Sequence, residues 1–140
     1  MTDIEAAERT ARMRAILFYL MAASLLLSAV LSVGNTDDPG MIRLALWLLM
    51  VVLTALNLTT VGGWFKSRDL VALLNDEVTR DHRRTALAVG FWAALASSFA
   101  LTLVTSNHPL AAADTTRVTI TAALMAALIA FATLELRAAR

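Results

Sequence analysis

Four long apolar stretches, separated by short polar segments, constrain this chain more than any other feature. Each holds about 19–21 residues, and together they cover approximately residues 15–33, 44–63, 85–105 and 118–136. A helix of that length rises about 1.5 Å per residue and crosses the ~30 Å hydrocarbon core of a bilayer. Lipid offers backbone N–H and C=O groups no partners, so membrane-spanning segments of this kind must be helical. The sequence therefore predicts an all-α membrane protein, a four-transmembrane-helix bundle of two antiparallel hairpins forming a single membrane domain over residues 1–140.

The composition agrees with this class and excludes several functions. The chain is 59% hydrophobic and 16% charged, against about 45–50% and about 25% for a soluble domain. It contains no cysteine, which excludes a disulfide framework, a thiolate metal site and a cysteine nucleophile. A formal net charge of +1 gives no argument for direct nucleic-acid binding. The first stretch exceeds the ~7–15-residue apolar core of a signal peptide, so we expect it to be a retained span.

Basic residues fall on one side of the predicted bundle. Only Arg43 and Arg117 lie on the other side, out of 12 Lys and Arg residues. Cytoplasmic segments of membrane proteins carry an excess of Lys and Arg. We therefore predict a multi-pass membrane protein with both termini and the loop 64–84 in the cytoplasm, which for a bacterial protein means the cytoplasmic (inner) membrane.

Small and weakly polar residues recur at helical spacing inside the spans. Ser24 and Ser28 share one face of the first span, and Ala86, Gly90, Ala94, Ser98 and Thr102 share one face of the third. Small residues let helices approach closely in lipid, and an amide in a span often bonds to a neighbouring helix. We favour packing over a pore, because no charge accompanies these stripes. The predicted packing residues are Ser24, Ser28, Asn57, Gly90, Ala94, Ser98 and Ala126.

Chemically reactive groups are scarce. No span has an acid or a base near its middle, and Glu135, in the last turn of the fourth span, is expected to reach the lipid headgroups. Trp47, Trp64 and Trp92 lie toward span ends, as membrane-interface aromatic residues do. His108 and the outer-loop aspartates fit turns better than a metal site. We therefore predict no catalytic residue, no metal and no cofactor, and we do not expect an enzyme.

The loop between the second and third spans is the most charged part of the chain. Its final section, "NDEVTRDHRR", pairs acids with bases three or four residues later, which stabilises a helix surface. Bases alone are enough to hold the loop in the cytoplasm, so the acids are surplus to anchoring. We predict a surface for a cytoplasmic protein partner, formed by Asp76, Glu77, Arg80, Asp81, Arg83 and Arg84.

The segment "LLNDEVTRDHRRTALAVGFW" carries a resemblance. It is similar to the acidic-pair hinge and following "A-x-x-x-G-F/Y-W" span start of uncharacterised small bacterial four-helix membrane proteins. The matching positions are Asp76, Glu77, Arg80, Arg84, Ala86, Gly90, Phe91 and Trp92. Members of this group are often encoded beside small helix-turn-helix regulators, so the resemblance implies a membrane-bound regulator of a transcription factor and no chemistry.

Three classes of function follow from the sequence. The first is a regulatory or scaffolding membrane protein that binds a cytoplasmic partner through the loop. The second is a small transporter or channel, in which a homo-oligomer would form the path. Small multidrug exporters have the same span count but carry a glutamate inside the first span, and residues 15–33 here contain no acid. The third is an accessory subunit of a membrane complex.

Overall fold

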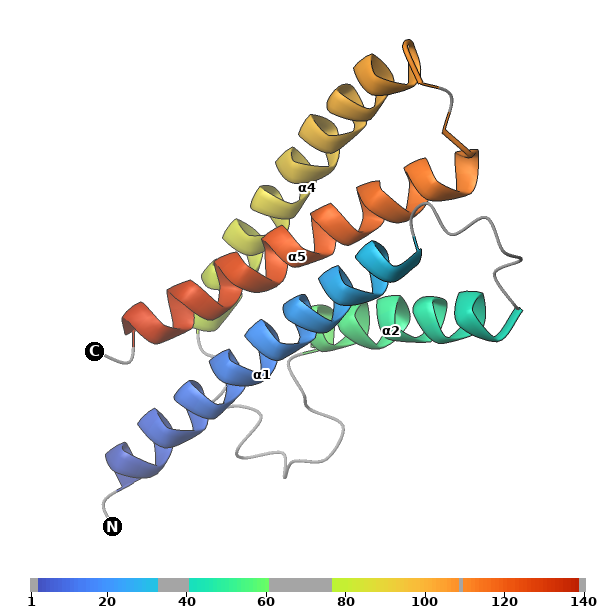
Figure 1. The fold of residues 1–140 in the computed structure, drawn as a ribbon. Helices are drawn as coiled ribbons and strands as arrows, with labels where there is room; N and C mark the ends of the chain where they lie inside the picture. The colour runs from blue at the N-terminus through green and yellow to red at the C-terminus, as the bar shows by residue number, and fades with distance from the viewer. Residues whose placement is uncertain (1–2, 33–40, 61–76, 109, 139–140) are drawn as a thin grey trace.

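The computed structural model describes residues 3–32, 41–60, 77–108 and 110–138, and these form four helices. The helices are α1 (Asp3–Ser32), α2 (Met41–Thr60), α4 (Glu77–Thr105) and α5 (Ala112–Ala138) (Figure 1). The predicted all-α four-helix bundle is confirmed. Three segments are long and apolar enough to cross a membrane: Arg12–Leu31, Thr79–Thr105 and Ala112–Ala138. The protein is therefore a multi-pass membrane protein.

The second predicted span differs in length from the other three. Its apolar helical part, Leu44–Thr59, is shorter than a full span, and residues 61–63 of the prediction lie outside the described residues. Figure 1 shows that α1 begins and α5 ends at the same end of the bundle, where α4 also begins. We call this the termini end. The end of α1, the start of α2, and the end of α4 with the start of α5 lie at the opposite end.

Helix α5 is the centre of the bundle. It packs along both α1 and α4, whereas α2 touches α1 and α5 over only a short length. Among the described helices, α4 has extensive contact with α5 alone. Figure 1 shows α4 separating from α5 toward the opposite end. The two predicted hairpins are therefore unequal, because the second is closely packed and the first is loose.

The core between α1 and α5 has a simple spacing. Its α1 positions recur every three or four residues, as in the seam of a coiled coil: Ala15, Phe18, Ala22, Leu25 and Ala29 are all buried. Phe18 meets Phe131 of α5 edge to face, with the ring centroids 5.1 Å apart and the rings inclined at 88°. This geometry is favourable for aromatic pairs. The seam joins α1 to α5 over most of the span.

The predicted serine stripe lies beside this seam and is not its centre. Ser24 and Ser28 are half-buried, and the Ser24 hydroxyl donates a hydrogen bond of 2.9 Å to the Met21 carbonyl of its own helix. Ala22, Leu25 and Ala29 take the deeper positions. Their side chains fill the interface and need no hydrogen bonds, while a serine must satisfy its hydroxyl within the helix.

The α4–α5 contact depends on small residues near the termini end. Ala86 and Gly90 are buried, and a Cβ on Gly90 would lie 2.9 Å from the Ala123 carbonyl oxygen and 3.0 Å from the Ala127 Cβ. Only glycine allows this approach of the two backbones. Farther along α4, Ala94 is half-buried and Ser98 is exposed. The predicted stripe therefore packs at one end of the helix and diverges at the other.

Two other side chains depart from expectation. Asn57 donates a hydrogen bond of 2.9 Å to the Leu53 carbonyl within α2, so the bond that the structure gives it does not join two helices as predicted. Trp47 is only 5% exposed, which makes it a packed residue and not a member of a lipid-facing belt. Trp92 is 68% exposed, and Trp64 lies outside the described residues.

Large apolar side chains cover the outside of the bundle. Phe91, Trp92, Phe99 and Leu103 are all well exposed on α4. A contiguous apolar surface of this kind is unfavourable in water and is typical of a face that meets lipid or another helix. The exposed apolar residues on α1 and α2 extend the same surface around the molecule. This distribution agrees with a membrane location.

Candidate functional site

Three helices meet at a buried ionic cluster near the termini end. The Arg14 Nη2 of α1 lies 2.5 Å from the Glu135 Oε2 of α5, and the His82 Nδ1 of α4 lies 3.7 Å from the other carboxylate oxygen. Glu135 is 6% exposed. We call Arg14, His82 and Glu135 the Glu135 cluster. A charge-assisted contact of this kind fixes the relative positions of the helices that supply its members.

The surroundings of this cluster are partly apolar. The Arg14 guanidinium lies 5.5 Å from the centroid of the Phe131 ring, within the range of a cation–π contact. Three nitrogen atoms are buried without a hydrogen-bond partner among the described residues: the Nε atoms of Arg14 and Arg83 and the Nδ1 of His82. Arg83 lies close enough to Arg14 for the two positive charges to repel each other. The Arg14 Nε is thus a buried donor that the Glu135 carboxylate does not satisfy.

The position of Glu135 corrects the sequence interpretation. We expected this side chain to extend toward lipid headgroups, but it turns into the bundle and pairs with Arg14. A helix position near the end of a span can face either way, and the choice depends on which side a cation approaches. Arg14 lies 121 residues earlier in the chain, so local sequence around Glu135 does not reveal the pair.

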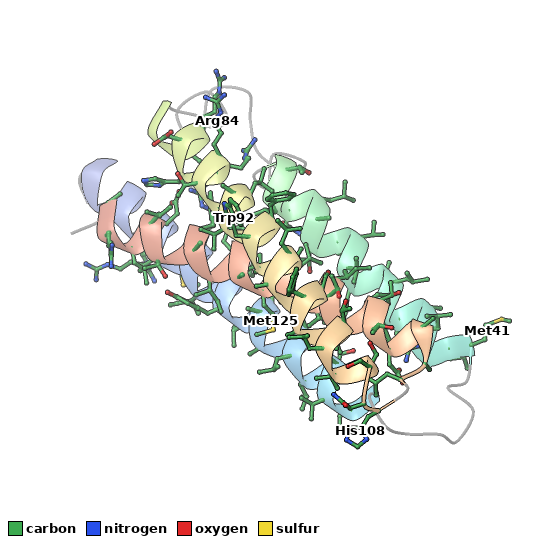
Figure 2. The ribbon with its side chains drawn as sticks, turned by 90° about the horizontal axis from the view of Figure 1, so that it is seen from above. Met41, Arg84, Trp92, His108 and Met125 are labelled. Carbon is green, nitrogen blue, oxygen red and sulfur yellow. The ribbon has the colours of Figure 1, made fainter. Side chains whose placement is uncertain are left out.

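The predicted partner surface is only partly described. Arg80, Asp81 and Arg84 are exposed in the first turns of α4, and Arg83 is half-buried beside the Glu135 cluster. Figure 2 shows Arg84 and His108 at opposite ends of α4. Asp76 lies outside the described residues, and Glu77 begins α4 but its side chain is not described. Three of the six predicted residues thus form an exposed charged patch next to a buried ionic cluster.

A second buried polar group lies toward the opposite end. Arg117 of α5 is 7% exposed, and its guanidinium lies 5.9 Å from the Trp47 ring centroid of α2. Thr121, one turn farther along α5, is 3% exposed. We call Trp47, Arg117 and Thr121 the Arg117 cluster. The sequence analysis placed Arg117 on the outer side as an orienting charge and did not predict its burial.

Two grooves flank α5. One, of about 700 Å³, runs between α1 and α5 and is almost entirely apolar; Ala126 is among its lining residues. The other, of about 330 Å³, opens where α4 and α5 separate and is lined by Ser98 and several threonines. Thr102 and Thr105 direct their hydroxyls to carbonyls of their own helix at 2.8 Å each. Hydrogen-bonding capacity in the second groove is therefore largely used within the helices.

Two further contacts escaped the sequence analysis. Thr133 donates to the Ile129 carbonyl at 2.7 Å, so the Tyr19 hydroxyl donates the 2.9 Å bond that joins it to Thr133 across α1 and α5. Tyr19 and Thr133 belong to no charged group and no small-residue stripe, so nothing in the sequence indicates that they pair. Over the ranges that the structure describes, no three His, Cys, Asp or Glu side chains gather as a metal site would require.

The protein is thus a membrane-embedded helical bundle with a buried ionic cluster at one end and a buried, cationic group near the other. No protein-family model, no curated protein and no solved structure matches the chain.

Proposed function

We propose that this protein is a regulatory or scaffolding protein of the bacterial cytoplasmic membrane, with both termini and the start of α4 in the cytoplasm. It binds a cytoplasmic protein through the charged start of α4. A helix-turn-helix transcription regulator is the partner that the resemblance of residues 73–92 implies. The observation that carries the proposal is the exposure of Arg80, Asp81 and Arg84 directly beside the buried Glu135 cluster.

The Glu135 cluster holds the neighbouring exposed charges in a fixed position, which favours binding. A surface already held in one conformation loses less entropy on association than a mobile one. His82 and Arg83 lie in the same helical turns as the exposed charges, and His82 approaches Glu135 of α5. The α4 start is therefore attached to the rest of the bundle by side chains that point inward. The neighbouring side chains that point outward are left for a partner.

A transporter receives less support from the same geometry. Ion-coupled carriers use an ionisable group in the membrane that exchanges its ion during the cycle. Glu135 is the one carboxylate among the described residues that is buried, and Arg14 engages it directly. A carboxylate in this pair has a fixed structural partner. We therefore assign it to the architecture of the binding surface.

The test is a comparison of captured proteins in mild detergent. The parent, a triple variant (Asp76→Asn, Glu77→Gln, Asp81→Asn) and a control (Asp114→Asn) are expressed at equal level, and bound proteins are quantified by mass spectrometry. Asp114 is an acid in the first turn of α5, at the opposite end of the bundle. The triple variant should capture the specific partner about tenfold less than the parent, because charge-assisted contacts contribute about 1.5–3 kcal/mol.

The control should capture the partner as the parent does. Orientation should not change in any variant, since acids contribute little to it. A protein that all three forms capture equally, at low and at physiological salt, is not held by this surface. If no captured protein depends on the three acids, the proposed function is wrong.

A further inference from the structure

The Arg117 cluster contains a cation without a counter-charge. Among the described residues, no carboxylate lies within ion-pair distance of Arg117, and its Nε is buried without a hydrogen-bond partner. A guanidinium stays protonated in proteins, and burying a charge is unfavourable unless it is paired. The Trp47 ring at 5.9 Å offers a cation–π contact, which compensates only part of that cost.

Two more polar groups beside Arg117 are also unsatisfied. The Trp47 Nε1 and the Thr121 Oγ1 are buried and have no hydrogen-bond partner in the part of the chain that the structure describes. Tryptophan and arginine can only donate, and a threonine hydroxyl can donate as well. Two helices therefore direct donors and one full positive charge into the same region. That combination matches the acceptors and the charge of an oxyanion.

The apolar groove between α1 and α5 includes one member of this cluster, Thr121, among its lining residues. Thr121 lines it together with Val118, one residue from Arg117. From there the groove continues along α5 to Ile129, with Leu26, Val30 and Met125 on its walls. Eleven residues of helix correspond to about 16 Å. Its volume of about 700 Å³ lies within the range of ligand-binding pockets. Arg117 itself does not line the groove but lies one helical turn before Thr121, so a buried cation stands beside one end of a groove that is apolar along its length.

We propose that this site binds an anionic phospholipid, with the phosphate at Arg117, Trp47 and Thr121 and one acyl chain in the α1–α5 groove. Arg117 lies five residues from the start of α5 at Ala112, about 7.5 Å along the helix, and directly before the predicted span 118–136, so a phosphate bound there would lie at the edge of the hydrocarbon layer. A guanidinium binds phosphate through two parallel hydrogen bonds. A zwitterionic headgroup brings its own cation, so an anionic lipid complements Arg117 better. This inference does not depend on partner binding at the termini end.

The test uses the fluorescence of Trp47. The chain has three tryptophans, so the double substitution Trp64→Phe and Trp92→Phe leaves only Trp47. The protein is reconstituted in phosphatidylcholine nanodiscs that contain increasing fractions of phosphatidylglycerol brominated near the carboxyl end of its chains. Bromine quenches tryptophan on contact. Half-maximal quenching should occur at a mole fraction about tenfold lower than with brominated phosphatidylcholine, the difference that one charge-assisted contact supports.

Three variants assign the effect to the site. Arg117→Gln should abolish the preference for the anionic lipid, and Thr121→Val should weaken it while preserving side-chain shape. Ala126→Leu should reduce quenching by filling the groove without changing any charge. Ala100→Leu makes the same change at an exposed position of α4 and should behave like the parent. If circular dichroism shows that Arg117→Gln does not fold, the Thr121→Val and Ala126→Leu variants are sufficient for the test.

Several results would overturn the proposal. Equal quenching by both brominated lipids in the parent would mean ordinary lipid contact. A preference that persists in Arg117→Gln or in both other site variants would place the lipid elsewhere. Displacement of brominated phosphatidylglycerol by equimolar oleate would identify a fatty acid as the ligand, and displacement by inorganic phosphate would identify a free anion.

Discussion

Arg14 and Glu135 show how a buried charge acts in this bundle. Each is almost enclosed, with side chains 15% and 7% exposed. Their attraction offsets the loss of hydration, and the pair adds little net stability compared with apolar side chains of similar size. Its contribution is specificity, because no other described carboxylate is buried where α1, α4 and α5 meet. The pair is therefore expected to favour one alignment of α1 against α5.

This interpretation predicts a non-additive pair of substitutions. Glu135→Leu leaves Arg14 buried without a counter-charge and should destabilise the bundle by about 3–5 kcal/mol. Arg14→Met should have a similar effect through Glu135. The double variant should be more stable than either single variant, because both charges are removed together. Thermal unfolding in detergent, followed by circular dichroism, measures all four forms.

Asp81→Asn serves as the control, since it neutralises an exposed acid on α4 and should change the midpoint little. Additive effects of the two substitutions would mean that Arg14 and Glu135 do not stabilise each other.

The α4–α5 contact is the clearest feature at the scale of elements. Gly90 lets the α4 backbone come against Ala123 and Ala127, and close backbone approach is a main source of helix association in lipid. Toward its C-terminal end, α4 moves away from α5, and Ser98 lines the groove between the two helices. One end of α4 is thus held tightly and the other end loosely.

Gly90→Leu should therefore be much more harmful than the same kind of change on the outer face. The new side chain would collide with the α5 backbone, and overpacking of this kind costs about 1–3 kcal/mol or more. We expect a lower unfolding midpoint or a changed oligomer size in detergent, measured by circular dichroism and size-exclusion chromatography. Ala100→Leu, on the exposed side of α4, should be neutral. If both variants match the parent, α4 does not pack on α5 through Gly90.

The elements were predictable from the sequence, and their contacts were only partly so. Hydrophobic length identifies spans because the bilayer has a fixed thickness. It does not identify which face of a span is buried, since lipid and protein interior are equally apolar. Gly90 was found because a small residue has a physical reason to lie at a contact. Glu135, Arg117 and Trp47 were misassigned because each is buried by a residue far away in the chain.

For the whole molecule, the arrangement of charge is asymmetric along the bundle axis. Four exposed bases lie at the termini end of the bundle: Arg9, Arg12, Arg80 and Arg84. Helices α1 and α4 begin at this end, and α5 ends there (Figure 1). Arg117, toward the other end, is buried. Exposed bases close to a span determine orientation, so we expect the termini end to be cytoplasmic.

Reporter fusions test this orientation. Alkaline phosphatase and green fluorescent protein, each fused at Asp38 and after residue 140, should give opposite signals at the two sites. Phosphatase should be active at Asp38, and fluorescence should appear after residue 140. Equal signals at both sites would mean that an odd number of helices crosses the membrane. Opposite signals in the reverse sense would contradict the orientation alone.

The central place of α5 has a consequence for biosynthesis. Helices α1 and α4 precede α5 in the chain, so they leave the ribosome and enter the bilayer before their main packing partner exists. The Tyr19–Thr133 hydrogen bond, for example, closes over 114 residues. Lateral assembly must therefore wait for the last of the four helices, and a nascent chain interrupted within α5 leaves three inserted helices without the surface that joins them.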